Sequence, residues 1–347
     1  MTTFAEMTNE TYYINEKPST LIEYLNIKKY SQIGVLTDAN TYSACYPLIK
    51  DALPTHTLIQ VQPGEEVKNL DTCIIIWQKL TDLNFDRHSL LLVLGGGVLG
   101  DMGGFCAATY KRGIDFVLMP TTLLAQVDAS IGGKLGIDFN HYKNHIGVFQ
   151  SPVTTLISSA FLNTLPEREL RSGFAEVIKH CLISDAPMWE AIRNQKLDAQ
   201  DWNTLITHSV KFKTQVVTED PREKGVRKIL NFGHTIGHAV ESYFLHSGNR
   251  IFHGEAIAIG MIAEAHIAYQ KQLLNKEDLK SITTYLIGIF GRQINMPSDD
   301  VVLKNMYQDK KNKGNTILMA LTKGIGDALW DVEASEEEIK KDRKSVV

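Results

Sequence analysis

Short apolar runs separated by helical patterns fill the first 150 residues of the chain. Candidate strands lie at Gln32–Thr37, His56–Val61, Ser89–Leu94 and Phe116–Met119. Between the second and third runs, Glu65–Leu80 has apolar residues at helical spacing. Strands that alternate with helices are typical of a parallel sheet covered by helices. This part of the chain is therefore predicted to be α/β.

From about Ala160 the pattern changes, because strand-like runs nearly vanish and long amphipathic segments take over. Helices are predicted over Glu169–Leu182, Trp202–Val217, Ile236–Phe244 and Glu255–Leu273. A chain of 347 residues is also long for one hydrophobic core. We therefore predict two domains, an α/β domain over residues 1–155 and an all-α domain over residues 156–347.

Composition narrows the class of protein. Hydrophobic residues make up 44% of the chain and charged residues 22%, as in ordinary globular proteins. The net charge of -4 gives no general attraction to nucleic acid or to a membrane surface. No apolar run has the length of a membrane span, the first residues lack a signal-peptide pattern, and the four cysteines show no CxxC spacing. We expect a cytoplasmic protein with reduced thiols.

A glycine-rich turn follows the third candidate strand. Gly95, Gly97 and Gly100 fit G-x-G-x-x-G and precede a helix predicted over Met102–Tyr110. Glycine lets the backbone approach a pyrophosphate, whose charge then meets the helix N-terminus, although glycine runs also serve tight turns. The acidic residue usual about twenty positions later has no clear candidate. Asp38 ends an earlier strand instead, which predicts dinucleotide binding with an unusual strand assignment.

Three histidines lie close together further along the chain. His234 and His238 are four residues apart and share one helix face, and His253 follows. Imidazole is the commonest metal ligand, and a catalytic zinc normally has three protein ligands. Spacing alone favours these three histidines, but a carboxylate from another helix is equally allowed. Glu176 is such a candidate, or else a surface carboxylate paired with Lys179.

Together the motifs resemble one family, the 3-dehydroquinate synthases. The matching runs extend from about residue 37 to residue 325 and include Gly95–Asp101, Pro120–Ala125, Val127–Lys134, Lys143–Gly147, Leu165–Glu169, Glu176–Lys179, Arg227–Glu241, His253–Ala256 and Asp309–Lys311. The resemblance implies an N-terminal Rossmann-like NAD domain, a helical C-terminal domain and an active site in the cleft between them. It also implies a homodimer, with NAD and Zn²⁺ or Co²⁺ as cofactors.

The resemblance also implies roles for individual residues. Those implied to contact NAD are Asp38, Asn40, Glu65, Lys68, Gly95, Gly96, Gly97, Val98, Asp101, Thr121, Thr122, Lys134, Lys143, Phe161 and Thr164. The implied metal ligands are Glu176, His234 and His253, which replaces the choice made from spacing. Substrate contacts and catalytic roles are implied for Arg112, Asp128, Lys134, Asn144, Lys179, Lys213, Glu223, Arg227, Asn231, His238 and Lys311 or Lys310.

The implied substrate is 3-deoxy-D-arabino-heptulosonate 7-phosphate, whose carboxylate and phosphate match these cations. NAD would take hydride from C5, phosphate would leave, hydride would return, and ring opening with aldol closure would give 3-dehydroquinate. Three alternatives remain. Another sugar phosphate cyclase, of the 2-deoxy-scyllo-inosose or valiolone type, would share the first steps of the reaction. A metal-dependent polyol dehydrogenase would release NADH, and an inactive binding module would catalyse no reaction.

Overall fold

Two compact units make up the chain in a computed structural model, which describes residues 3–4, 12–14, 17–18, 29–140, 142–291, 296–307 and 316–342. Unit 1 comprises Met1–Leu170 and Trp202–Gln215, and unit 2 comprises Arg171–Asp201 and Val216–Val347. The chain passes from unit 1 to unit 2 near residue 170 and returns to unit 1 over Trp202–Gln215, while the predicted domains over residues 1–155 and 156–347 stay a prediction. Which ligand each predicted domain binds stays a prediction.

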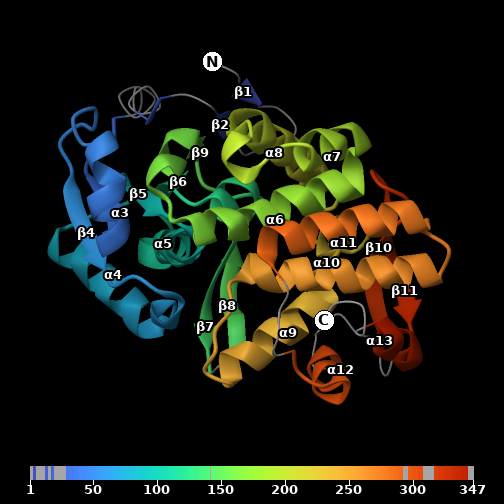
Figure 1. Cartoon of the computed structure of the whole chain (residues 1–347). Helices are drawn as coiled ribbons and strands as arrows, with labels where there is room; N and C mark the ends of the chain where they lie inside the picture. The colour runs from blue at the N-terminus through green and yellow to red at the C-terminus, as the bar shows by residue number, and fades with distance from the viewer. Residues whose placement is uncertain are drawn as a thin grey trace. The chain divides into compact units, whose positions relative to one another are not determined.

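A parallel sheet forms the centre of unit 1 (Figure 1). Among the described residues its strand order is β1-β2-β9-β6-β5-β3-β4. The strands are β1 (Thr3–Phe4), β2 (Tyr12–Ile14), β3 (Ile33–Asp38), β4 (Thr57–Val61), β5 (Leu90–Gly95), β6 (Asp115–Pro120) and β9 (Thr154–Ile157). All neighbours are parallel except β1 and β2. The four predicted strands are confirmed as β3 to β6, and every residue of β5 is buried, as expected for a central parallel strand.

The helices of unit 1 lie between these strands in the chain or follow the last of them. They are α3 (Ala39–Ala44), η1 (Tyr46–Leu48), η2 (Glu65–Val67), α4 (Leu70–Asp82), α5 (Gly97–Thr109), η3 (Tyr110–Arg112), η4 (Ala125–Ala129), η5 (Ser159–Thr164) and most of α8 (Trp202–Glu219). The helix predicted over Glu65–Leu80 is divided, because the Asn69 side chain accepts a hydrogen bond from the Thr72 amide and starts α4 there. The helix predicted from Met102 begins earlier, at Gly97.

A β-hairpin after β6 was not predicted. Its strands β7 (Lys134–Phe139) and β8 (Tyr142–Phe149) pair antiparallel. Most β8 side chains are exposed, so the strand has no apolar run that would reveal it in the sequence. The strands also approach closely at Gly147, where an added Cβ would lie 2.3 Å from the carbonyl oxygen of Leu135.

Unit 2 is mainly helical. Its elements are α6 (Glu167–Ser184), α7 (Ala186–Arg193), η6 (Leu197–Ala199), η7 (Val226–Asn231), α9 (His234–His246), α10 (His253–Gln270), α11 (Lys276–Phe290), α12 (Asp299–Tyr307) and α13 (Glu336–Asp342). The predicted helices correspond to α6, α8, α9 and α10, with ends shifted by a few residues. The residues of α10 are mostly apolar and buried on all sides of the helix. The helix packs against α9, α11 and β10, and Figure 1 shows it beside α11.

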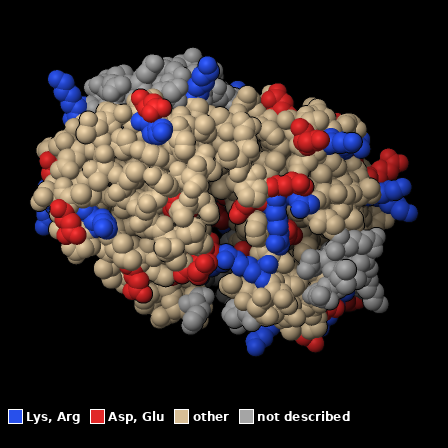
Figure 2. All heavy atoms as spheres, turned by 60° about the vertical axis from the view of Figure 1, so that its left-hand side comes forward, with Lys and Arg blue, Asp and Glu red and all other residues tan. Residues whose placement is uncertain are grey.

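The prediction of an all-α second half needs one correction. Unit 2 also contains an antiparallel hairpin of β10 (Ile317–Thr322) and β11 (Ala328–Ala334). No helix in the described part of the chain is long and apolar enough to cross a membrane. On the face that Figure 2 shows, basic and acidic side chains are interspersed and most of the surface is uncharged.

Candidate functional site

The predicted nucleotide loop lies where β5 turns into α5 in unit 1. Gly96 is the N-cap of α5 and provides no side-chain cap, so the first amides of the helix are available to an anion. The Thr121 amide donates to the Gly95 carbonyl at 3.0 Å, which brings the end of β6 beside the loop. An added Cβ on Gly96 would lie 3.0 Å from a methyl carbon of Thr122. A small cavity borders this turn and is lined by Gly95, Gly96, Gly97, Gly100, Asp101 and Ala129, among others.

A buried lysine connects two other residues that the resemblance selects. Lys68 Nζ lies 2.6 Å from Asp101 Oδ2 and 2.6 Å from Asn144 Oδ1. Burial raises the pKa of Asp101, and the charge of Lys68 opposes that shift. Nearby, Lys143 Nζ lies 3.6 Å from Glu65 Oε1. The structure thus brings together residues implied for NAD and, through Asn144, one implied for substrate.

At the end of β3, Asp38 is the N-cap of α3, where its Oδ1 accepts from the Thr41 amide at 2.8 Å. The next helical turn contains Cys45, whose thiol contacts Thr164 and Thr121. Burial raises the pKa of this thiol to about 11, so it stays protonated at neutral pH. Of the other residues implied for NAD, Asn40 and Lys134 are exposed, Val98 is half-buried and Phe161 is fully buried.

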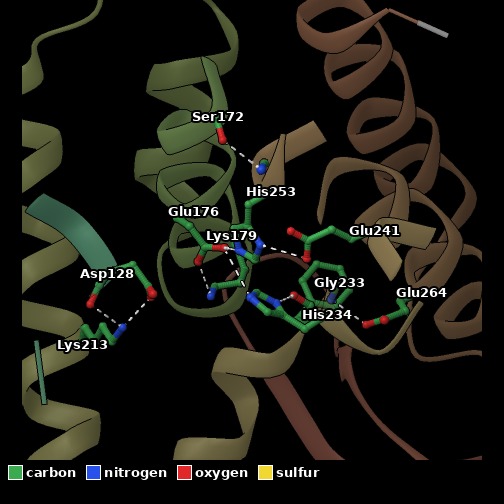
Figure 3. A network of polar contacts seen from close by, with 12 residues as sticks. Asp128, Ser172, Glu176, Lys179, Lys213, Gly233, His234, Glu241, His253 and Glu264 are labelled. Carbon is green, nitrogen blue, oxygen red and sulfur yellow. Dashed lines mark hydrogen bonds and ion pairs between the residues drawn. The ribbon is translucent and has the colours of Figure 1, made fainter. Parts of the chain in front are cut away.

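In unit 2 three side chains from three helices converge (Figure 3). Glu176 on α6, His234 on α9 and His253 on α10 place ligand atoms within 4.8 Å of one another. Glu176 Oε1 lies 3.4 Å from His234 Nε2 and 3.5 Å from His253 Nε2. Both oxygens of Glu176 are buried without a hydrogen bond among the described residues, although Lys179 forms an ion pair with one of them.

These separations fit a metal ion better than direct hydrogen bonds. Ordinary N–H···O bonds measure about 2.7–3.2 Å between heavy atoms. A tetrahedral ion with ligand bonds of about 2.1 Å would instead hold its donor atoms about 3.4 Å apart. The Glu176, His234 and His253 donors therefore have the spacing and chemistry of a zinc-type site, with a fourth position left for substrate.

Close helix contacts hold the three donors in place. The Gly254 amide, next to His253, donates to Ser172 Oγ at 3.0 Å. Ser172 lies one turn before Glu176 on α6, so this bond fixes the two helices beside each other at the donors. An added Cβ on Gly254 would lie 2.1 Å from the Ser172 carbonyl oxygen, so only glycine permits this approach.

Both imidazoles have partners on their other nitrogen. His234 Nδ1 lies 3.1 Å from the Phe232 carbonyl oxygen, so this nitrogen donates and Nε2 is free to bind a metal. His253 Nδ1 lies 3.6 Å from Glu241 Oε2, the carboxylate–histidine arrangement common in metal sites. His238, Glu241 and His253 also bring ligand atoms within 4.8 Å, but the proximity of Glu241 to Nδ1 favours an orienting role.

The pKa values of the three residues are shifted in different directions by their surroundings. Burial opposes ionisation of Glu176, but Lys179 and His234 hold its pKa well below the usual range. Burial, reinforced by Lys179, lowers the pKa of His234 well below its usual value. Burial also disfavours charge on His253, but contacts with Glu176 and Glu241 raise its pKa to about 10. Glu176 is therefore ionised, and a cation bound here would replace the proton that Glu176 and Glu241 favour on His253.

Cations and amides implied for substrate binding are fixed by polar partners. In unit 1, Lys213 Nζ lies 2.5 Å from Asp128 Oδ1. In unit 2, Arg227 is buried and its Nη1 donates to the Pro221 carbonyl at 2.8 Å. Asn231 Nδ2 donates to Glu223 Oε1 at 2.7 Å. The lysine–aspartate and asparagine–glutamate pairs each unite two residues that the resemblance names.

The loop before η7 is held by a carboxylate that the sequence analysis did not single out. Asp220 accepts hydrogen bonds from the amides of Lys224, Gly225 and Arg227 at 3.0, 2.6 and 3.2 Å. Burial raises the pKa of Asp220, but these bonds outweigh it and lower the pKa below its usual value. The ionised carboxylate thus fixes the loop that presents Glu223 and Arg227.

The structure also places other residues that the resemblance implies. His238 lies on α9 with its ring centre 5.1 Å from that of His234, beside the metal-type cluster. Arg112 is exposed in the turn after α5, and Lys134 is exposed at the start of β7. Lys310 and Lys311 lie outside the described residues.

Two further carboxylates were missed by the sequence analysis. Glu241 lies two turns after His234 on α9, so helical spacing alone could have found it. Glu264 is the only charged residue in the buried apolar run Ala256–Ala268 of α10, which is the sequence signal of a buried, partnered carboxylate.

Two models of one protein family match successive parts of the chain. Residues 58–172 match the family model of the 3-dehydroquinate synthase N-terminal region, and residues 173–312 match that of the C-terminal region. A 3-dehydroquinate synthase of Parabacteroides distasonis is 38% identical over 327 residues, which cover 92% of this chain and 93% of that protein.

Solved structures share the fold at lower identity. A 2-deoxy-scyllo-inosose synthase complexed with carbaglucose-6-phosphate, NAD⁺ and Co²⁺ has a TM-score of 0.85 at 24% identity, covering 97% of each chain. The 2-epi-5-epi-valiolone synthase of Streptomyces hygroscopicus subsp. jinggangensis, with NAD⁺ and Zn²⁺ bound, has a TM-score of 0.87 at 23% identity, covering 100% of this chain and 98% of that one. These likenesses concern the fold alone. With both family regions matched and a relative aligned over nearly its whole length, this chain belongs to the 3-dehydroquinate synthase family.

Proposed function

We propose that this chain converts 3-deoxy-D-arabino-heptulosonate 7-phosphate to 3-dehydroquinate and phosphate, with NAD and Zn²⁺ or Co²⁺ as cofactors. The observation that carries the proposal is the convergence of Glu176, His234 and His253 in a chain of this family. A sugar phosphate with a carboxylate also suits the many fixed cations of the chain, because charge-assisted bonds bind such anions strongly.

The cofactors supply the redox and Lewis-acid chemistry. NAD would supply reversible hydride transfer, and a divalent ion would supply Lewis-acid polarisation of a substrate oxygen. Glu176, His234 and His253 would hold the ion, while Asp38, the Gly95–Asp101 turn and Lys68 would hold the nucleotide. Zinc and cobalt both suit this ligand set.

The chain's own polar residues would orient and neutralise the substrate. Lys213, held by Asp128, and Arg227, held by the Pro221 carbonyl, present positive charge from fixed positions. Fixed donors stabilise charge that develops during the reaction without reorganising. Asn231 and Glu223 are already hydrogen-bonded, so the amide reaches the substrate in one orientation. The other residues implied for the substrate would likewise bind and position it. They are Arg112, Lys134, Asn144, Lys179, His238 and Lys311 or Lys310.

The experiment is to incubate the metal-loaded protein with the heptulosonate phosphate and NAD and to follow phosphate and 3-dehydroquinate. We expect the two products in equal amounts. Glucose 6-phosphate and sedoheptulose 7-phosphate, the substrates suited to other sugar phosphate cyclases, serve as controls. Cyclisation of either control compound, with no product from the heptulosonate phosphate, would reject the proposal in favour of another cyclase.

A test of the nucleotide site is the substitution Asp38→Ala. We expect the Kd for NAD to rise about tenfold to a hundredfold, because a hydrogen bond to a charged group contributes about 1.5–3 kcal/mol. Loss of the α3 cap should also lower the free energy of unfolding by about 1 kcal/mol. Calorimetric titration with NAD measures the first effect and denaturant unfolding the second.

The matched control is Asp86→Ala. Asp86 accepts hydrogen bonds from the His88 amide and from Ser31, in the turn before the opposite end of β5. We expect a comparable loss of stability with an unchanged Kd for NAD. Equal weakening of NAD binding in both variants would mean that Asp38 acts only through stability.

The family resemblance also supports two further proposals, that the protein is a homodimer and that it works in the cytoplasm. Light scattering of the purified protein tests the first, since a homodimer should have twice the chain mass of 38.9 kDa. A stable monomer at assay concentration would reject it.

A further inference from the structure

A fully buried carboxylate on α10 holds the start of α9. Glu264 Oε2 accepts from the Gly233 amide at 2.5 Å, and Oε1 accepts from the Ile236 amide at 3.0 Å. These two amides lie on either side of His234 in the sequence. Figure 3 shows Glu264 beside Gly233 and His234. Both oxygens of one carboxylate are therefore used at the turn that presents a proposed metal ligand.

The first turn of α9 depends on this partner because it has no cap of its own. Its N-cap is Gly233, in the left-handed region at φ +79, and makes no side-chain cap hydrogen bond. The first amides of a helix have no intrahelical acceptor, and a buried amide without a partner costs about 1–3 kcal/mol. Glu264 provides, from another helix, the hydrogen-bond acceptor that a serine or aspartate N-cap usually provides. Its negative charge also interacts favourably with the positive end of the helix dipole.

The same helix carries a second ligand. His253 is the first residue of α10, and Glu264 lies about three turns further along. Between them, Gly260 allows contact with α9, since an added Cβ there would lie 1.8 Å from the Gly233 carbonyl oxygen. One rigid helix thus provides His253 directly and fixes the turn of His234 through Glu264.

We propose that Glu264 is a positioning residue for the metal site. It does not touch the ion but holds His234 Nε2 at its distance from Glu176 and His253 by clamping the first turn of α9 to α10. Affinity for the ion, and the geometry of the bound ion, should therefore depend on Glu264. The inference rests on the proposed metal site of Glu176, His234 and His253.

The test is Glu264→Gln in the full-length protein. The amide has nearly the same shape but offers one acceptor oxygen and two donors. One of the Gly233 and Ile236 amides would then face an N–H group. We expect Zn²⁺ affinity, measured by competition with a chromophoric chelator, to weaken about tenfold or more, as for other outer partners of metal ligands. The visible spectrum of the Co²⁺-loaded protein should also change, which a mere loss of stability would not cause.

The matched control is Asn275→Ala, which removes the side-chain cap of α11, where Asn275 Oδ1 accepts from the Asp278 amide at 2.8 Å. It should lower the Tm while the Zn²⁺ Kd and the Co²⁺ spectrum stay those of the wild type. A Glu264→Gln protein with wild-type Kd and spectrum would overturn the inference, whatever its Tm.

A second variant keeps the test decisive if Glu264→Gln does not fold. Glu264→Asp retains the charge but is one methylene too short to reach both amides, so weaker Zn²⁺ binding is expected and unchanged binding would overturn the inference. Failure of the underlying site is recognised separately. In that case the wild type binds no ion, or His234→Ala binds it as the wild type does.

Discussion

Replacing His234 by alanine is expected to abolish tight metal binding and, with it, activity. The substitution removes one of the two imidazoles whose Nε2 atoms lie 3.4 and 3.5 Å from Oε1 of the buried Glu176. Loss of an outer partner already costs about 10–100-fold in metal affinity, so loss of a direct ligand should cost more than about 100-fold. Metal analysis after dialysis and chelator competition measure the change.

His238→Ala is the matched comparison, because its ring lies next to that of His234 on the same helix. This variant should retain the ion with wild-type affinity and lose about 100-fold in kcat, as expected when one positioned polar group is removed. Equal loss of metal in the two variants would contradict the ligand assignment. It would instead favour the three-histidine site that spacing alone suggests.

Gly260→Ala is expected to cause the largest loss of stability. An added Cβ would lie 1.8 Å from the Gly233 carbonyl oxygen and 2.7 Å from the Gly237 amide nitrogen. Both are backbone atoms of the segment that begins α9, so the helices must move apart. Overpacking of this kind costs about 3 kcal/mol, or a Tm lowered by roughly 10 °C. Because His234 moves with α9, Zn²⁺ affinity should fall as well.

Gly288→Ala provides the control in a neighbouring helix of unit 2. Gly288 is exposed in α11, and an added Cβ would meet nothing within 4 Å. Alanine is a better helix former than glycine, so stability should rise by about 0.5–1 kcal/mol with unchanged metal affinity. Thermal unfolding of the metal-free proteins separates the two cases. A Gly260→Ala protein as stable as the wild type would show that α9 and α10 do not pack as described.

Much of the fold could be predicted because burial leaves a pattern in the sequence. The strands β3, β5 and β6 are apolar runs because almost all of their residues are buried, and α10 is a long apolar helix. The hairpin of β7 and β8 was not predicted because most of its second strand is exposed. The β10–β11 hairpin was missed for a different reason, because β10 is a short buried apolar run, which periodicity alone does not distinguish from a helix segment.

The site could be predicted only in part. Helical spacing brings His234 and His238 to one face, yet it cannot tell which of them binds an ion. That choice depends on Glu176, which comes from α6 and reaches His253 only because Ser172 and Gly254 hold the two helices together. Family resemblance selects Glu176, whereas periodicity does not. Glu264 acts through tertiary hydrogen bonds that no local pattern specifies.

The ratio of phosphate released to NAD supplied tests the central claim most directly. The metal-loaded protein, freed of nucleotide, is given an excess of the heptulosonate phosphate and one equivalent of NAD per chain. If hydride is returned within each turnover, many equivalents of phosphate and 3-dehydroquinate should form without net accumulation of NADH. Phosphate release that stops after one equivalent while NADH accumulates would contradict the account and indicate a dehydrogenase.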